Sequence, residues 1–279
     1  MIFRLLNLLK GKYHLFKIYK RIKKFFYNID QTTILLFGFQ KSGNTWLRLL
    51  LYNYRNLLLN PDLNQTITYD VLNVIQNNHL DSGTTFLPRN GFPLFYRTHT
   101  SYTNTYDLFD KKIFIHRNPL DTLISSYYFW KYRDTPFLYE PENIRTRLDD
   151  IDFYVSYKIK SWIDFYNISI KHADFVLNYT EMKEDSEKSF RDLLCFLNWS
   201  IDEDILRKAV DISSFQKIKK MGKEKSQEYG NAPKDGSFKG EFTRSGEEAQ
   251  FKNELKQETI DLVLDKFPLF NNLYPNLID

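Results

Sequence analysis

The sequence predicts an α/β fold, with a single doubly wound and mostly parallel sheet flanked by helices. Short apolar runs at residues 33–37, 92–98, 112–116 and 174–179 are typical of buried strands, and helical patterns lie between them. Strands that alternate with helices join as parallel neighbours with helices on both faces. We find no internal repeat and no clean boundary within this alternation.

Composition indicates one compact unit. The chain has 279 residues and a formal net charge of +4, a balance that argues against a nucleic-acid partner held by a general positive field. Cys195 is the only cysteine, which excludes an intrachain disulfide framework and argues against a cysteine metal site. We expect it to be a buried structural thiol in the apolar run 193–197, within a reducing, cytoplasmic compartment.

The first residues are set apart by their charge. No acidic residue precedes Asp30, while basic and apolar side chains mix throughout residues 1–27. A basic amphipathic helix of this kind either lies on the anionic inner face of a membrane, as a peripheral contact, or packs as a solvated helix on the domain. We therefore divide the chain into an N-terminal helical segment, 1–29, and a domain, 30–279. Neither a transmembrane helix nor a signal peptide is expected.

The stretch 33–50 joins a strand to a helix through a turn of Gly, Lys and Ser. Backbone N–H groups over 42–46 would lack intrahelical partners at this helix start, and the helix dipole adds partial positive charge there. Lys41 and the hydroxyls of Ser42 and Thr45 strengthen the interpretation as an anion site. The alternative is an ordinary strand-to-helix turn with a Ser or Asn cap.

Polar residues also stand at the ends of the next two predicted strands. His99 follows the strand 92–98, where open α/β sheets place their ligands, although a lone histidine is often a surface or core residue. Arg117 follows the strand 112–116, and Ser125 comes eight residues later, so both can reach one phosphate if the turn bends suitably. Alternatively, Arg117 forms a salt bridge with Asp121 and Ser125 packs at a small-residue contact.

The remaining segments are predicted as helices and loops. A turn is expected at Thr180-Glu181, after the last strand. Residues 221–248 are too long for an ordinary connection and are typical of a functional lid or a disordered segment. The expected helices cover 44–54, 69–76, 119–132, 154–166, 184–197, 202–210, 213–220 and 249–267, and the loops 58–91 and 134–150 are expected to shape a substrate site.

Taken together, the motifs over about 33–243 resemble the PAPS-dependent sulfotransferase family, which moves a sulfuryl group from 3′-phosphoadenosine 5′-phosphosulfate (PAPS) to an acceptor. Residues 39–46, FQKSGNTW, resemble the family's 5′-phosphosulfate loop, with Gln40 and Asn44 replacing proline and threonine. The resemblance implies that loop residues bind the donor: Lys41, Ser42, Gly43, Asn44, Thr45 and Trp46. It also implies that Arg117 and Ser125 hold the 3′-phosphate, because both match the motif at the family spacing.

The same resemblance assigns catalytic roles. Arg97-Thr98-His99 is similar to the family's Lys-Thr-His segment, which implies His99 as general base, with Arg97 steadying the sulfonate or the acceptor. Lys41 would neutralise charge on the oxygen that links phosphate to sulfur as that bond breaks. The implied reaction is an in-line transfer to a hydroxyl or amine of a small-molecule, lipid or carbohydrate acceptor, which leaves PAP and needs no metal.

The family's adenine contacts and its C-terminal clamp match less uniformly. The resemblance implies that four residues surround the adenine: Trp46, Tyr179, Ser213 and Phe215. Residues 236–243 resemble the family's Gly-Asp-Trp-Lys-Asn-His-Phe-Thr segment, but Asn-Ala-Pro at 231–233 replaces the Arg-Lys-Gly triplet that holds the 3′-phosphate. Lys234 is our substitute for that triplet.

The resemblance implies an architecture like that of P-loop NTPases, and two other functions compete with sulfuryl transfer. A P-loop kinase or NTPase would carry Gly-x-x-x-x-Gly-Lys-Ser/Thr, whereas Lys41 here precedes Gly43. A noncatalytic nucleotide- or membrane-binding protein on the same fold would not need the full set of Lys41, His99, Arg117 and Ser125. The sequence does not predict the acceptor or the oligomeric state.

Overall fold

The computed structural model of the chain describes residues 32–61, 67–68, 71–72, 94–132, 136–137, 139–224 and 244–278. The predicted helical segment 1–29 and Lys234 lie outside the described residues, and so do the resembling segment 236–243, nearly all of the predicted helix 69–76 and most of the loop 58–91.

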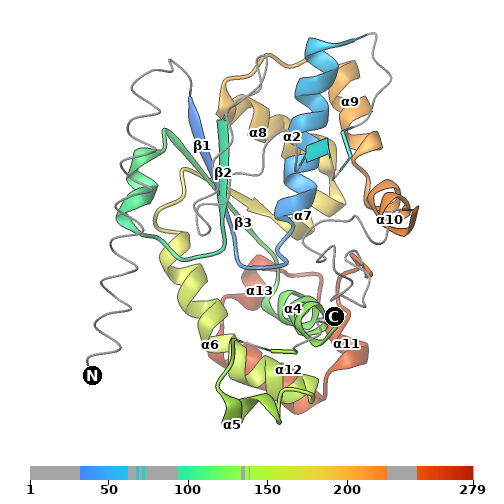
Figure 1. Ribbon diagram of the computed structural model, residues 1–279. Helices are drawn as coiled ribbons and strands as arrows, with labels where there is room; N and C mark the ends of the chain where they lie inside the picture. The colour runs from blue at the N-terminus through green and yellow to red at the C-terminus, as the bar shows by residue number, and fades with distance from the viewer. Residues whose placement is uncertain are drawn as a thin grey trace.

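The centre of the described part is a four-stranded sheet in the order β2-β1-β3-β4 (Figure 1). All three strand pairs are parallel, as the sequence predicts. Each strand overlaps one of the predicted apolar runs, because strands covered on both faces are largely apolar. The strands are β1 (Thr33–Phe37), β2 (Leu94–Thr98), β3 (Lys111–His116) and β4 (Phe175–Asn178).

Helices cover both faces of the sheet, which makes the fold doubly wound (Figure 1). Ile34 and Leu36 of β1 pack into one buried apolar cluster, with residues of α2 (Asn44–Leu59), α7 (Tyr179–Glu184), α8 (Ser186–Leu197), α9 (Glu203–Ile212) and α10 (Phe215–Glu224). Leu35 and Phe37 point the other way, into the cluster with residues of α4 (Pro119–Lys131), α6 (Ile151–Ser169), α11 (Phe251–Glu254), α12 (Gln257–Lys266) and α13 (Phe270–Leu273). Two short elements, η2 (Asn104–Leu108) and α5 (Glu142–Arg145), complete the described structure.

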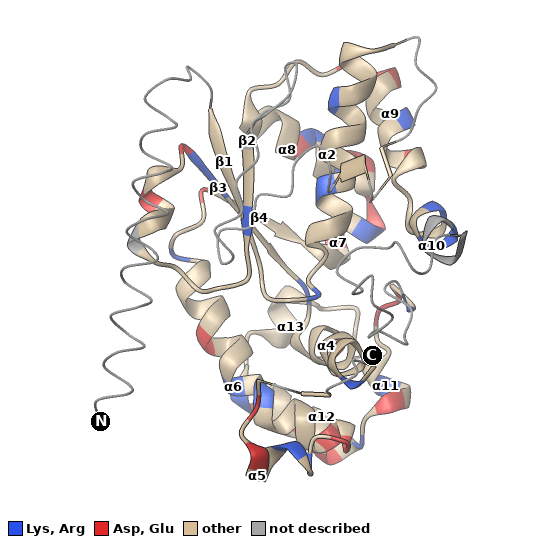
Figure 2. Ribbon diagram, in the orientation of Figure 1, with Lys and Arg blue, Asp and Glu red and all other residues tan. Residues whose placement is uncertain are grey.

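The outer helices carry mixed charge. Figure 2 shows acidic and basic residues interspersed along α8 and α9. Arg191 of α8 and Glu203 of α9, for example, pair at 2.6 Å. Exposed pairs of this kind contribute little stability, typically below about 1 kcal/mol, so the fold depends on the two apolar clusters.

Three sequence predictions are corrected by the structure. The turn expected at Thr180-Glu181 is a helix, α7, because the Asn178 side chain accepts a hydrogen bond from the Thr180 N–H at 3.0 Å and caps it. The single helix expected over 249–267 is two helices, α11 and α12, because Leu255 between them is extended. Cys195 is exposed rather than buried, since the inward face of α8 is formed by its neighbours Leu193, Leu194 and Leu197.

The parallel strands bring their carboxyl ends to one edge of the sheet. Phe37 of β1 pairs with Thr98 of β2 and with Phe114 of β3, and His116 of β3 pairs with Asn178 of β4. The residues that follow these ends therefore gather at that edge, where open α/β sheets bind ligands.

The described residues contain neither a membrane-spanning helix nor a metal-binding cluster of side chains. None of the helices there is long and apolar enough to cross a membrane. No group of three or more His, Cys, Asp or Glu side chains in the same residues is placed to hold a metal ion.

Candidate active site

The start of α2 has no side-chain cap and no acidic residue in its first turn. Its N-cap residue is Gly43, at φ 105°. The first intrahelical bond runs from the Leu47 N–H to the Gly43 carbonyl at 3.1 Å, so the preceding N–H groups have no partner in the helix. By contrast, α6, α8 and α9 are each capped by an aspartate. The turn therefore lacks the Ser or Asn cap of the alternative interpretation, and the anion site stays a prediction.

Buried polar atoms without hydrogen-bond partners cluster in this loop. Among the described residues, the Ser42 hydroxyl, both polar atoms of the Asn44 amide and the Trp46 indole N–H have none. Ser42 is 0 % exposed. Because buried polar groups are nearly always paired, such a group in a loop is a candidate contact for a ligand. Lys41 directly precedes these residues in the sequence. Its ammonium lies 4.8 Å from the centroid of the Phe129 ring on α4.

His99 is oriented by the neighbouring strand. Its Nδ1 lies 2.9 Å from the Gly38 carbonyl oxygen, one residue beyond the paired ends of β1 and β2. A carbonyl oxygen only accepts, so Nδ1 carries the proton and Nε2 of the neutral ring is the basic nitrogen. The ring is half-buried. This tautomer is the one that a general base acting through Nε2 requires.

Arg97 lies in the interior. It is 5 % exposed and pairs in register with Leu36 of β1, so it points to the face of the sheet that α2 covers. Thr98 points to the opposite face, and its hydroxyl lies 2.8 Å from that of Thr100. The segment 97–99 therefore presents His99, rather than Arg97, at the exposed end of β2.

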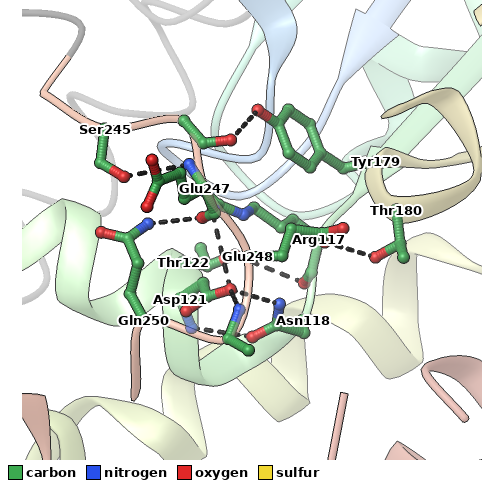
Figure 3. Close-up of polar contacts among 12 residues, drawn as sticks. Arg117, Asn118, Asp121, Thr122, Tyr179, Thr180, Ser245, Glu247, Glu248 and Gln250 are labelled. Carbon is green, nitrogen blue, oxygen red and sulfur yellow. Dashed lines mark hydrogen bonds and ion pairs between the residues drawn. The ribbon is translucent and has the colours of Figure 1, made fainter. Parts of the chain in front are cut away.

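Arg117 lies between β3 and α4 and is 4 % exposed (Figure 3). Its Nη2 donates to the Glu247 carbonyl at 2.5 Å and lies 3.6 Å from Asp121 Oδ2, so the salt bridge considered from the sequence is present. Its guanidinium also stacks over the Tyr179 ring at 4.7 Å. Ser125 lies one turn beyond Asp121 on the same face of α4, half-buried.

Tyr179 joins the two predicted phosphate sites. Its ring lies 5.4 Å from that of Trp46, and a Cβ added at Gly43 would stand only 2.7 Å from it. Burial raises the pKa of the Tyr179 phenol, so its O–H donates, and it does so to the Gly246 carbonyl at 3.3 Å. The structure therefore brings Trp46, Tyr179 and Arg117 together.

The other two predicted adenine contacts lie on α10 and just before it. Phe215 packs against Gly246, where an added Cβ would be 2.2 Å from the ring. Ser213 is 0 % exposed, and its hydroxyl accepts from the Asn53 amide of α2 at 2.9 Å. Ser213 is thus held by the fold, whereas Phe215 faces the segment that follows residue 243.

That segment is the part of the site that sequence reasoning missed. The Thr180 hydroxyl donates to Glu248 Oε1 at 2.6 Å, and the Ala249 N–H donates to Asp121 Oδ2 at 2.9 Å (Figure 3). Burial raises the pKa of Glu248. In the sequence, only the unusual length of the connection 221–248 indicated a functional role. No local pattern in residues 244–250 predicts partners on α4 and α7.

Curated relatives match a part of the chain. Sulfotransferase 2A6 of Rattus norvegicus is 32% identical over 114 residues, which cover 39% of this chain and 39% of that protein. Sulfotransferase 1C2 of the same species is 27% identical over 115 residues, covering 39% of this chain and 37% of that protein. The chain thus matches well under half of the length of these relatives.

Solved structures match more of the chain and share its fold. Retinol dehydratase in complex with retinol and PAP superposes with a TM-score of 0.65 at 15% identity, covering 87% of this chain and 82% of that one. Mouse sulfotransferase SULT7A1 complexed with PAP gives a TM-score of 0.55 at 20% identity, covering 89% and 86%. The family model of the sulfotransferase domain matches residues 31–267. With that match over most of its length, the chain belongs to the sulfotransferase family.

Proposed function

We propose that the protein transfers a sulfuryl group from PAPS to a hydroxyl or amine of a small-molecule, lipid or carbohydrate acceptor. The observation that carries this proposal is the gathering of an uncapped helix start, an oriented histidine and a buried arginine at one edge of the sheet. These are an anion cradle, a base and a second anion contact, which together fit a donor with two phosphate positions.

The residues present fit this donor. The unpaired Ser42, Asn44 and Trp46 groups, with the N–H groups at the start of α2, are suited to the 5′-phosphosulfate. Arg117 and Ser125 would hold the 3′-phosphate, with Lys234 as a further candidate. The remaining contacts complete the nucleotide site: Gly43 and Thr45 in the loop, and Trp46, Tyr179, Ser213 and Phe215 around the adenine.

When bound, PAPS supplies an activated sulfuryl group on its 5′-phosphate, and PAP is the product. His99 accepts the proton of the acceptor hydroxyl or amine at Nε2, since Nδ1 is held by Gly38. Lys41 and the loop N–H groups stabilise the negative charge that collects on the departing phosphate oxygen. The proposed role of Arg97, steadying the sulfonate or the acceptor, rests on the family resemblance alone, because its side chain lies in the interior beside β1.

The acceptor and the location of the protein are further proposals. The similar structures of retinol dehydratase hold androsterone or retinol, and we therefore propose a small-molecule acceptor first for this chain too. We also propose a cytoplasmic protein in which residues 1–27 touch the inner face of a membrane, because that segment is basic and has no acidic residue.

A transfer assay tests the proposal. The purified chain is incubated with PAPS labelled in its sulfate and with a panel of phenols, sterols, lipids and sugars, and both labelled product and PAP are measured. We expect equimolar PAP and sulfated product, and a loss of roughly 10²-fold or more in Lys41→Ala, with Lys160→Ala as the control at an exposed lysine of α6. Phosphoryl transfer from ATP with no use of PAPS would overturn it.

A further inference from the structure

Residues Ser245–Ala249, called the strap here, lie across the residues that the proposed function assigns to the nucleotide (Figure 3). The Glu247 carbonyl accepts from Arg117, the proposed 3′-phosphate contact, at 2.5 Å. The Gly246 carbonyl accepts from Tyr179, a proposed adenine contact, at 3.3 Å. The strap therefore presents two main-chain oxygens to two residues assigned to the nucleotide.

Gly246 fits closely against a third nucleotide residue. A Cβ added there would lie 2.2 Å from a carbon of the Phe215 ring, so only a glycine backbone can approach the ring this closely. Its φ of 66° is also one that other residues rarely adopt. The backbone of Gly246 thus covers the Phe215 ring, against which a purine is expected to stack.

Both sides of the strap are tied down. The Ala249 N–H donates to Asp121 Oδ2 at 2.9 Å, and Asp121 is 0 % exposed. The Glu248 carboxylate accepts from the Thr180 hydroxyl at 2.6 Å. Lys183 adds a bond from its ammonium to the Gly246 carbonyl at 3.0 Å. These bonds run to α4 and α7, so the strap is docked on the body of the domain.

A phosphate and the docked strap compete for Nη2 of Arg117, while Nε of the same guanidinium is buried without a partner among the described residues. The guanidinium is 4 % exposed, and its Nη2 is held by the Glu247 carbonyl. The strap also holds the Glu248 side chain against Thr180, where a carboxylate would repel a phosphate dianion. A phosphate oxygen can replace the Glu247 carbonyl only if the strap moves.

We infer that the strap is a built-in competitor of the nucleotide: it covers the 3′-phosphate and purine contacts in the nucleotide-free protein and is displaced when PAP or PAPS binds. This inference rests on the proposed function. Its consequence is that the observed nucleotide affinity equals the intrinsic affinity multiplied by the fraction of molecules with the strap undocked. Changes that weaken docking must therefore tighten nucleotide binding.

Two variants weaken docking by different means. Glu248→Ala removes the bond to Thr180, and Gly246→Ala adds a Cβ against Phe215 at an unfavourable φ. We expect PAP, measured by titration calorimetry on the full chain, to bind about fivefold more tightly to Glu248→Ala and about tenfold more tightly to Gly246→Ala. Glu247→Gln is the matched control, because it removes the same charge from an exposed side chain and keeps the carbonyl. We expect its affinity to change by less than about twofold.

Hydrogen exchange reports the strap itself. The Ala249 amide is protected in the nucleotide-free chain by its bond to Asp121, so saturating PAP should speed the exchange of peptides that cover 245–249 by about tenfold or more. Circular dichroism of each variant checks that it is folded. If Glu248→Ala alone fails this check, Gly246→Ala and the exchange measurement on the unaltered chain still decide.

The outcomes separate the inference from the proposed function. If PAP binds while exchange in the strap stays unchanged or slows, the strap is not displaced and the inference is overturned, although the donor assignment stands. If neither the unaltered chain nor the two variants bind PAP, the proposed function fails and the inference fails with it. Binding that appears only in the variants supports the inference, because the docked strap then blocks the site.

Discussion

The imidazole Nδ1 of His99 lies 2.9 Å from the carbonyl oxygen of Gly38. The contact extends the register of β1 and β2 by one residue, so the sheet itself sets the tautomer of the proposed base. The loop with Lys41 begins directly after Gly38, and so the backbone that orients the base also leads into the anion cradle.

His99→Ala should lower turnover by roughly 10²-fold or more, while the dissociation constant of PAP changes by less than about twofold, because a general base acts on the acceptor proton. Steady-state rates and titration calorimetry measure the two effects. His172→Ala is the control, since that ring stacks on Tyr102 at 3.5 Å away from the predicted donor contacts. Unchanged turnover in His99→Ala would remove this residue from the mechanism.

Arg117→Ala should weaken PAP binding by roughly 10 to 100-fold, the scale of lost hydrogen bonds to a charged group. Adenosine 5′-monophosphate, which lacks the 3′-phosphate, should lose less than about threefold in the same variant. The ratio of the two losses is the measurement. Equal losses for both nucleotides would show that Arg117 holds the structure of the site rather than the 3′-phosphate.

Much of the fold follows from the sequence because the central strands are covered on both faces. Each of the four strands contains a short apolar run, and three proposed site residues were found because they follow strand ends: Lys41, His99 and Arg117. Cys195 was misplaced because an apolar run on a helix need not face inward at every position.

The strap could not have been predicted in the same way. Its bonds to Arg117 and Asp121 join residues 130 and 128 positions apart, and nothing in the local sequence around Gly246 encodes them. The helix α7 was missed for a related reason, since its start depends on the side-chain cap from Asn178 rather than on an apolar period. Long-range and capping contacts are therefore where the structure adds most.

Ser42→Ala separates binding from stability. The Ser42 hydroxyl is buried with no partner among the described residues, so its removal should change the free energy of unfolding by less than about 1 kcal/mol. PAP binding should weaken by roughly tenfold, because a hydrogen bond to a charged phosphosulfate is lost. Ser169→Ala is matched to it, as another buried and unpaired hydroxyl on α6, and should leave PAP binding unchanged. Equal PAP affinities for the two variants would contradict the loop assignment.

The N-terminal segment can be tested with vesicles. If residues 1–27 contact an anionic surface, the full chain should co-sediment with phosphatidylserine vesicles, and a chain that starts at Asp30 should not. Raising the salt from about 0.1 M to 1 M should release the full chain, because the Debye length falls from about 10 Å to about 3 Å. Equal sedimentation of both chains would favour the packed helix instead.

A buried histidine next to Arg117 should make stability depend on pH. His116 ends β3, and its Nδ1 lies 2.6 Å from the Tyr274 hydroxyl. Burial lowers the pKa of His116 from 6.5 to about 4, because the charged ring would lose its hydration. The residue is therefore largely neutral in the folded chain at a pH well above 4.

The direction of the pH dependence follows from which state, unfolded or folded, protonates His116 at the higher pH. As the pH falls below 6.5, the unfolded chain protonates His116 while the folded chain does not, so stability is lost progressively between pH 6.5 and about 4. The full loss from this group is about 3 kcal/mol. His116→Gln keeps a polar group near Tyr274 but cannot titrate. Urea unfolding should therefore show that the free energy of unfolding of the unaltered chain falls by about 3 kcal/mol relative to that of His116→Gln as the pH falls from 7 to 4. A constant difference over this range would show that His116 does not titrate with a depressed pKa.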